Sequence, residues 1–172
     1  MRCKVCKDKF EPKYFLQKTC FEPDCIIKYK NQVKSKEWKK EKKRIKERLK
    51  THSDHVQELQ KVFNKFIRLR DVNQLCISCN KPLPVKYDAG HYRSCGSSPE
   101  HRFNEKNCHA QCVYCNQHLH GNLIEYRKGL IKRIGVEEVE LLENYIIPLK
   151  YSIPELIEMK VIYKEKIKKL SS

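Results

Sequence analysis

Ten cysteines dominate the chemistry available to this sequence, and eight of them form four closely spaced pairs. Two thiolates on a short turn can bind one ion, and two such pairs complete a tetrahedral zinc site. Grouped by proximity along the chain, the pairs predict two structural zinc sites. The first would use Cys3, Cys6, Cys20 and Cys25, and the second Cys76, Cys79, Cys112 and Cys115.

The alternative for these pairs is buried or redox-active thiols. A redox-active Cys-x-x-Cys normally occurs once in a chain, beside a βαβ pattern, so the repeated spacing favours metal. The N-terminus lacks the apolar stretch of a secretory signal. We therefore expect a reducing cytosol, where disulfides are rare. Cys95 and Cys108 are left over and are expected to pack in the interior.

The overall charge indicates what the protein binds. Among 172 residues, 37 Lys and Arg outnumber 21 Asp and Glu, which gives a net charge of +16. Such an excess favours a polyanion, first of all nucleic acid. No glycine-rich dinucleotide or P-loop motif is present. No apolar run reaches the roughly 18 residues of a membrane span, so no membrane partner is expected.

The insert between the two Cys-x-x-Cys pairs of the second site, residues 80–111, carries polar residues in an order typical of a ββα-metal, or HNH, nuclease. Phosphodiester hydrolysis needs a base for water, and a neutral imidazole such as His91 can serve near pH 7. It also needs a hard divalent cation, Mg²⁺ or Mn²⁺, held by oxygen ligands. Asn116 could supply an amide oxygen, and Asp88 or Glu105 a carboxylate.

Three further residues of this region have proposed roles. Asn107 could either hold the loop that carries His91 or bind the metal, and the sequence does not decide between these roles. Arg93 and Arg102 could grip the phosphate. Each of these polar residues also has a purely structural alternative, such as a turn cap, a helix cap or an ion pair.

The elements that must position these residues are mainly helical, with small zinc-stabilised β elements. Residues 1–27 resemble a zinc ribbon, in which Phe10, Tyr14, Phe15 and Phe21 are expected to pack round the metal. Residues 71–135 would form the zinc-framed HNH-like core, with strands confined to 83–112 and a helix from Cys115 to about Ile134, stopped by Gly135. Residues 136–172 would form C-terminal helices over 136–147 and 154–169, punctuated by Pro148 and Pro154.

Between the zinc units, residues 28–70 predict one long helix or two. The first half, 28–50, has 12 basic and 3 acidic residues, so it is either a solvated spacer or an arm that contacts phosphates. The arm would use Lys39, Lys40, Lys42, Lys43 and Arg44. The second half carries an apolar stripe that should dock on a core, formed by Val56, Leu59, Val62, Phe63, Phe66 and Ile67.

Several runs of uncommon residues resemble the NinG, or Rap, recombination proteins of lambdoid phages. They are 63–71 (FNKFIRLRD), 76–79 (CISC), 88–94 (DAGHYRS), 102–112 (RFNEKNCHAQC) and 121–127 (GNLIEYR), and the N-terminal cysteines also fit. The resemblance implies a structure-specific, divalent-metal-dependent DNA endonuclease acting on branched recombination intermediates such as Holliday junctions and D-loops. It also implies a phage or prophage protein in the cytosol of the bacterial host.

One departure from HNH nucleases concerns the first metal ligand. Many of them carry Asp or His immediately before the base, whereas Gly90 stands there in this sequence, so Asp88 becomes the candidate ligand. A homodimer would match the two-fold symmetry of a four-way junction, with the long helix as the dimer element. The alternative function is a non-catalytic, zinc-dependent DNA-binding module, such as a recombination accessory protein or a transcription factor.

Overall fold

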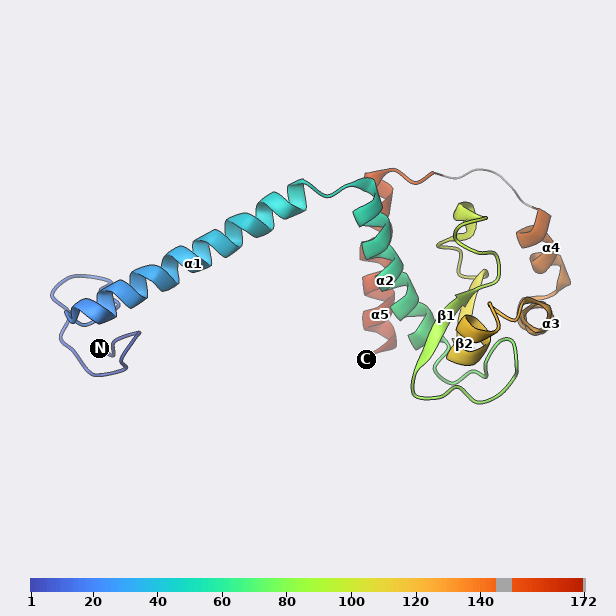
Figure 1. Cartoon of the computed structure of the whole chain (residues 1–172), viewed down its shortest axis with the longest axis horizontal. Coiled ribbons are helices and arrows are strands. Elements are labelled where there is room, and N and C mark those ends of the chain that lie inside the picture. The colour runs from blue at the N-terminus through green and yellow to red at the C-terminus, as the bar shows by residue number, and fades with distance from the viewer. Residues whose placement is uncertain (145–149, 172) are drawn as a thin grey trace. The chain divides into compact units, whose positions relative to one another are not determined.

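The computed structural model describes residues 1–144 and 150–171, and the chain forms two compact units, Met1–Lys50 and Thr51–Ser172. The elements of both units are shown in Figure 1. The fold is mainly helical with one two-stranded sheet, as the sequence predicted. Within the described residues, no helix has the length and apolarity needed to cross a bilayer.

The first unit consists of irregular loops followed by one helix, α1 (Pro23–Arg48). In the first unit, which is described in full, the only β pairing is the isolated bridge Arg2↔Lys9, in line with the prediction that strands are confined to 83–112. Cys25 lies in the first turn of α1 and is the only buried residue of that helix. The first unit is therefore a cysteine turn, a loop and a helix, with little apolar core of its own.

The predicted helical region 28–70 is divided into two helices. Helix α1 ends at Arg48, and α2 (His52–Arg70) begins after Thr51, whose side chain accepts from the Asp54 N–H in a reciprocal capping box. The cap satisfies two backbone donors at the start of α2 and so favours a new helix at this point. The boundary between the two compact units falls in this break.

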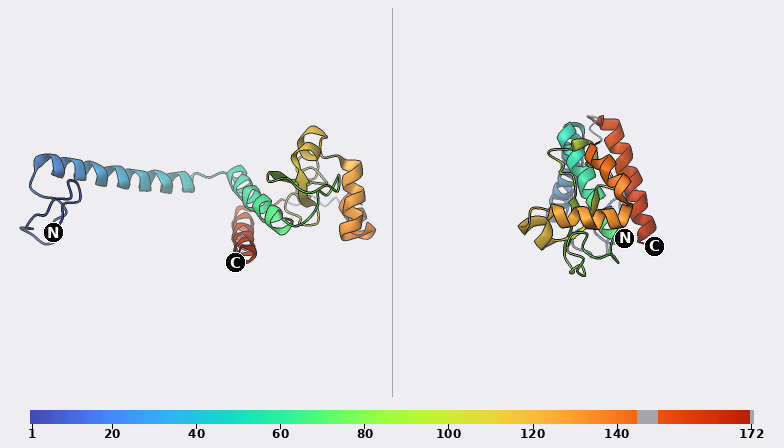
Figure 2. Two further views of the ribbon diagram at one scale, coloured as in Figure 1. Left: turned by 90° about the horizontal axis from the view of Figure 1, so that it is seen from below. Right: turned by 90° about the vertical axis from the view of Figure 1, so that its right-hand side faces the viewer.

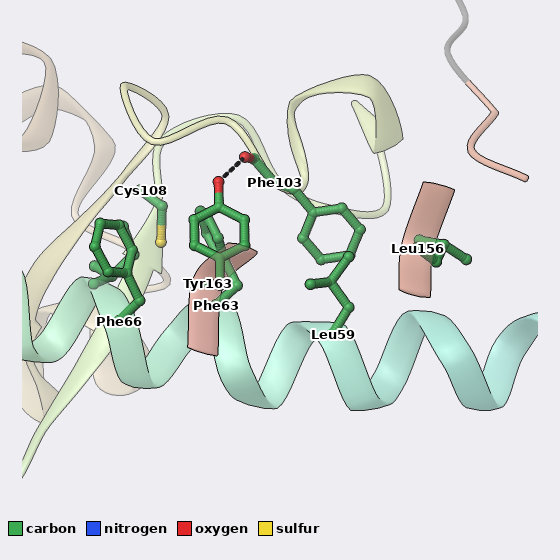
Figure 3. Packing of buried hydrophobic residues seen from close by; sticks show 8 residues of the cluster. Leu59, Phe63, Phe66, Phe103, Cys108, Leu156 and Tyr163 are labelled. Atoms are coloured by element: carbon green, nitrogen blue, oxygen red, sulfur yellow. Dashed lines mark hydrogen bonds between the residues drawn. The ribbon is translucent and has the colours of Figure 1, made fainter. Parts of the chain in front are cut away.

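The core of the second unit forms where α2 packs on α5 (Ile153–Leu170) and on one face of the sheet. Figure 2 shows α2 and α5 side by side. The predicted apolar stripe of α2 is confirmed. Its buried members are Leu59, Phe63, Phe66 and Ile67, with Val56 and Val62 partly buried. In Figure 3, Phe63 lies among Phe103 and Tyr163, and the Tyr163 hydroxyl donates to the Phe103 carbonyl.

The sheet is an antiparallel pair, β1 (Tyr87–His91) and β2 (Cys108–Cys112), inside the predicted range 83–112. Its register pairs Tyr87 with Cys112 and His91 with Cys108. Because side chains alternate along a strand, His91 shares a face with Cys108, whereas Asp88 lies on the opposite face. A 16-residue connection, with the 3₁₀ turn η1 (Pro99–His101), joins the strands.

The remaining helices follow the second Cys-x-x-Cys pair. A single π-helical turn, η2 (Tyr114–His118), precedes α3 (Leu123–Ile134), so the predicted continuous helix from Cys115 is interrupted. Helix α3 ends at Gly135, as predicted, and α4 (Val136–Asn144) packs against it. The end of the predicted helix 136–147 and Pro148 lie outside the described residues. Helix α5 starts one residue before the predicted position.

Candidate functional site

Both predicted cysteine groups come together in space. In each group the four Sγ atoms lie within 4.8 Å of one another. The Sγ–Sγ distances are 3.8 Å for Cys6–Cys20 in the first group and 3.7 Å for Cys76–Cys112 in the second. A tetrahedron with zinc–sulfur bonds of about 2.3 Å has edges of about 3.8 Å. The thiols therefore fit zinc without rearrangement.

The same local turn builds the first half of each cysteine group. Lys7 and Asn80, each following the second cysteine of a pair, adopt left-handed φ angles of 69° and 55°. Their N–H groups donate to the carbonyls of Cys3 and Cys76, over 3.1 and 2.9 Å. Asn tolerates this conformation better than most residues. The turn leaves both thiols of the pair directed at one point.

In each cysteine group, backbone donors lower the pKa of one thiol. Burial alone would raise the pKa of Cys3, but N–H donors of Cys20, Val5 and Cys6 outweigh it and lower that pKa to about 6. At Cys76 burial is likewise outweighed by backbone N–H donors, and its pKa is lowered. The Cys112 N–H donates to Cys76 Sγ over 3.4 Å. Each group thus holds one thiol that gives up its proton readily, as metal binding requires.

The second cysteine group clamps both ends of the insert 80–111. Cys76 and Cys79 follow α2, Cys112 ends β2 and Cys115 lies on η2. Asn122, which precedes α3, donates from its amide to Cys115 Sγ over 3.7 Å. The β hairpin and η2 are therefore fixed to one point, as expected for a zinc ion joining the two pairs.

A pocket of about 550 Å³ lies where β1 ends and η2 turns toward α3. Four of its lining residues could act on a phosphodiester: His91, Arg93, Asn116 and His120. The others are Ala89, Tyr92, Ser94, Cys95, Ser97, Gly121 and Leu123. The structure thus brings the predicted base and the predicted amide ligand to one cavity.

His91 is largely buried, and both of its ring nitrogens face protein atoms. Nε2 lies 3.0 Å from the Arg102 carbonyl oxygen, which can only accept, so Nε2 carries the proton. Nδ1 lies 3.6 Å from Cys108 Sγ, its cross-strand partner. Burial lowers the pKa of His91, although the bond to Arg102 opposes this. The imidazole is therefore neutral at pH 7, with its lone pair on Nδ1.

Asn107 holds the loop that carries His91. Its side chain is fully buried, and its Oδ1 accepts from the Arg93 N–H over 2.7 Å. Its Nδ2 donates to the carbonyls of Arg93 and His101, each over 3.0 Å. Of the two roles that the sequence left open, this geometry is that of a brace between the chain after β1 and η1.

Asp88 contacts Asn116 but is not among the residues that line the pocket. Its Oδ2 accepts from Asn116 Nδ2 over 2.9 Å and from Gln117 Nε2 over 2.8 Å. The bond fixes the amide of Asn116 so that its oxygen points away from Asp88. Glu105, the other predicted carboxylate, pairs with Lys166 on α5 over 2.5 Å and does not line the pocket either.

The structure explains why Gly90 precedes His91. A Cβ at Gly90 would collide with the side chain of Gln111, which is fully buried and donates to Ser78 Oγ and to the Gly121 carbonyl, both over 2.6 Å. A metal-binding Asp or His has no room at this position. The side chain found there in many HNH nucleases therefore has no counterpart at position 90 of this chain.

The two predicted phosphate-binding arginines differ in their surroundings. Arg93 lines the pocket, and its buried Nε has no hydrogen-bond partner among the described residues. Arg102 lies outside the pocket lining, where its guanidinium donates to the Cys95 carbonyl over 3.0 Å and to Gln60 Oε1 over 3.4 Å. Arg102 thus ties the loop to α2, and Arg93 alone is available at the pocket.

His120 is the pocket residue that sequence reasoning missed. It lies four residues after Asn116, in the break between η2 and α3, and has a left-handed φ of 48°. Gly121 follows it with a φ of 89°. The Gly-Asn dipeptide at 121–122 is a turn signal inside the predicted helix, and it was the available indication that the helix is broken here.

The basic residues predicted to form the arm all lie on α1 and are exposed: Lys39, Lys40, Lys42, Lys43 and Arg44. Arg44 pairs with Glu41 over 3.1 Å at the surface, a contact that contributes little to stability. The cations therefore surround a solvated helix that has no apolar face to bury.

Comparisons with known proteins agree with the resemblance found in the sequence. The family described as "Bacteriophage Lambda NinG protein" matches residues 1–172. "Protein ninG" of Escherichia phage lambda is 39% identical over 189 residues, covering 98% of this chain and 92% of the relative. "Protein ninG" of Salmonella phage P22 is 38% identical, with 98% and 93% covered. No solved structure gives a significant match. The chain therefore belongs to the NinG family of phage proteins.

Proposed function

We propose that the protein is a structure-specific endonuclease that cuts branched recombination intermediates, such as Holliday junctions and D-loops, by metal-dependent hydrolysis. The observation that carries the proposal is the pocket that His91, Arg93, Asn116 and His120 share. A base, a cation at the phosphate and two metal-binding groups are the parts that phosphodiester hydrolysis needs.

The surroundings of each side chain support one role in this reaction. A divalent ion such as Mg²⁺ or Mn²⁺ would neutralise charge on the phosphate and the leaving oxygen. Asn116, with its amide oriented by Asp88, and His120 would hold that ion. Arg93 would bind a non-bridging phosphate oxygen. His91 would take a proton from water through Nδ1, which requires its ring to turn from Cys108 toward the pocket.

The basic surface supports DNA as the substrate. Residues 28–50 carry a net charge of +9, and those of their lysines that lie on α1 are exposed. Contacts of this kind bind phosphates without reading bases, which suits an enzyme that recognises the shape of a junction. We also propose a homodimer, because a four-way junction has two-fold symmetry, and a place of action in the host cytosol.

The test compares His91→Ala with the parent on a labelled synthetic four-way junction, in Mg²⁺, Mn²⁺ and EDTA. Loss of a general base is expected to slow cleavage by about 100-fold or more. The matched control is His118→Ala, because His118 is an exposed imidazole on η2 that does not line the pocket. Junction affinity and zinc content should stay unchanged in both variants. Equal cleavage by His91→Ala and the parent would refute the assigned base.

A second candidate function is a zinc-dependent DNA-binding module without catalysis. The observation that favours it is the enclosure of His91, whose two ring nitrogens already face Arg102 and Cys108. If the parent binds junctions tightly but cuts none with any divalent metal, the binding module replaces the endonuclease.

A further inference from the structure

An exposed apolar loop projects from the first cysteine unit. Sequence reasoning expected its aromatic residues to pack round the metal, and that expectation is wrong. Phe15 is 90% exposed, and Tyr14 and Leu16 are 63% and 62% exposed. The four thiols draw the surrounding backbone together, and the unit is too small to cover these side chains as well. Three adjacent apolar side chains that are exposed to solvent indicate a binding surface.

The loop is held in this form by its own contacts. Gln17 is buried, and its Oε1 accepts from the Lys13 N–H over 2.9 Å while its Nε2 donates to the Thr19 carbonyl over 2.8 Å. Leu16 has a left-handed φ of 65°, a strained conformation for a residue that carries a Cβ. The fixed Gln17 keeps the loop in this shape, so Tyr14 and Phe15 are presented to solvent on a closed turn.

Basic residues are frequent in the chain on both sides of the exposed loop. Residues 1–18 contain six Lys and Arg (2, 4, 7, 9, 13 and 18) and two acidic residues (8 and 11), a net charge of +4. The Lys4 N–H donates to the Lys18 carbonyl over 2.9 Å, which brings those two segments together beside the loop. Lys13 Nζ lies 4.8 Å from the centroid of the Phe21 ring. Ammonium groups interleaved with flat rings match a ligand with phosphates and exposed bases.

We propose that the loop 13–17 is a stacking platform for unpaired DNA bases, with Phe15 and Tyr14 against the bases and the nearby lysines on the phosphates. This inference rests on the proposed function, because it takes DNA as the ligand. It adds that the loop binds the single-stranded part of a branched substrate. An anionic membrane is a poorer match, because a helix that lies on a membrane needs an apolar face and α1 has none.

The experiment uses the full-length, zinc-loaded protein in a buffer without added divalent metal. It measures the Kd for a labelled oligothymidine strand and for a labelled duplex of equal length. Base stacking is worth roughly 5- to 100-fold in affinity per ring. Phe15→Ala and Tyr14→Ala should each weaken single-strand binding by about that factor. Both should leave duplex affinity within about twofold, because phosphate contacts remain. Phe15→Trp should keep the parent affinity, which a purely structural role for Phe15 does not predict.

A second readout reports stacking directly. The fluorescence of 2-aminopurine in the strand should fall on binding to the parent and fall less with Phe15→Ala. Val85→Ala is the matched control, since Val85 is a fully exposed apolar residue of the other unit. Unchanged single-strand binding, or equal losses for strand and duplex, would overturn the proposal.

Other outcomes separate this inference from the proposed function. Loss of binding to anionic vesicles by Phe15→Ala, with strand binding intact, would overturn the inference in favour of a membrane surface. A parent that binds duplex and junction but loses nothing with Phe15→Ala would refute only the inference. A parent that binds no DNA of any form would refute both.

Discussion

Replacement of Asn107 by Ala tests whether this residue is a brace or a metal ligand. The change removes three hydrogen bonds, to the Arg93 N–H, the Arg93 carbonyl and the His101 carbonyl. The side chain is fully buried, so water cannot easily replace it. A buried group left without a partner costs about 1–3 kcal/mol. If each of the three costs about 1 kcal/mol, the free energy of unfolding falls by about 3 kcal/mol.

The assay is urea unfolding of the zinc-loaded protein, followed by circular dichroism with and without Mg²⁺. A brace predicts the same loss in both conditions. Asn104→Ala is the control, because among the described residues the Asn104 side chain accepts one hydrogen bond, from the Lys106 N–H over 2.9 Å at a turn, and the variant should lose about 1 kcal/mol or less. Asn107→Asp should also destabilise, since a carboxylate oxygen would face two carbonyl oxygens.

The opposite result would refute the brace. If Asn107→Ala unfolds within 1 kcal/mol of the parent but no longer responds to Mg²⁺, and if Asn107→Asp binds Mg²⁺ more tightly, Asn107 is a ligand. The reasoning from its three hydrogen bonds would then be wrong.

Three further predictions concern zinc, pH and packing. Elemental analysis should find about two zinc ions per chain, and a chain free of zinc would refute both sites. A strong chelator should unfold the first unit, because it has little apolar core to stabilise it without the metal. Burial and the nearby charge of Arg70 lower the pKa of His109 to about 3, whereas the unfolded chain takes up that proton near pH 6.5, so stability should be lost as the pH falls. Urea unfolding at both pH values should show a loss of about 2 kcal/mol in the free energy of unfolding between pH 7 and 5. This loss should be absent in His109→Gln. An equal loss in the parent and the variant would mean that another group causes it. A Cβ at Gly129 would collide with the Ile77 carbonyl, so Gly129→Ala should lower the melting temperature, whereas Gly96→Ala, at an open position, should not.

The cysteine sites could be predicted because their signal is local. A Cys-x-x-Cys turn needs only one residue with a left-handed φ after it, and Lys7 and Asn80 provide this in the two units. The grouping of the pairs into two sites followed from their proximity along the chain. The apolar stripe of α2 could be predicted for a similar reason, since helical periodicity alone states which side chains share a face.

The role of Asn107 and the position of Asp88 could not be predicted, because both depend on contacts across the hairpin. An Asn in sequence can cap, brace or bind metal, and only the loop folded over it decides. The aromatic residues of the first unit were misplaced for another reason. Apolar character predicts burial only when the surrounding chain can cover the side chain, and the first unit cannot cover Phe15.

The register of the hairpin connects the predictable part of the site with the rest. The second cysteine group fixes Cys112, and Cys112 lies opposite Tyr87. Because the strands are antiparallel, four residues further along β1 and four residues back along β2, His91 lies opposite Cys108. His91 is on the face toward α2. A slip of one residue would move every side chain of β1 to the other face and take His91 out of the pocket. The four thiols of this group, which could hold zinc, therefore determine where the imidazole points, and a variant that loosens Cys112 should displace His91 before it unfolds α2.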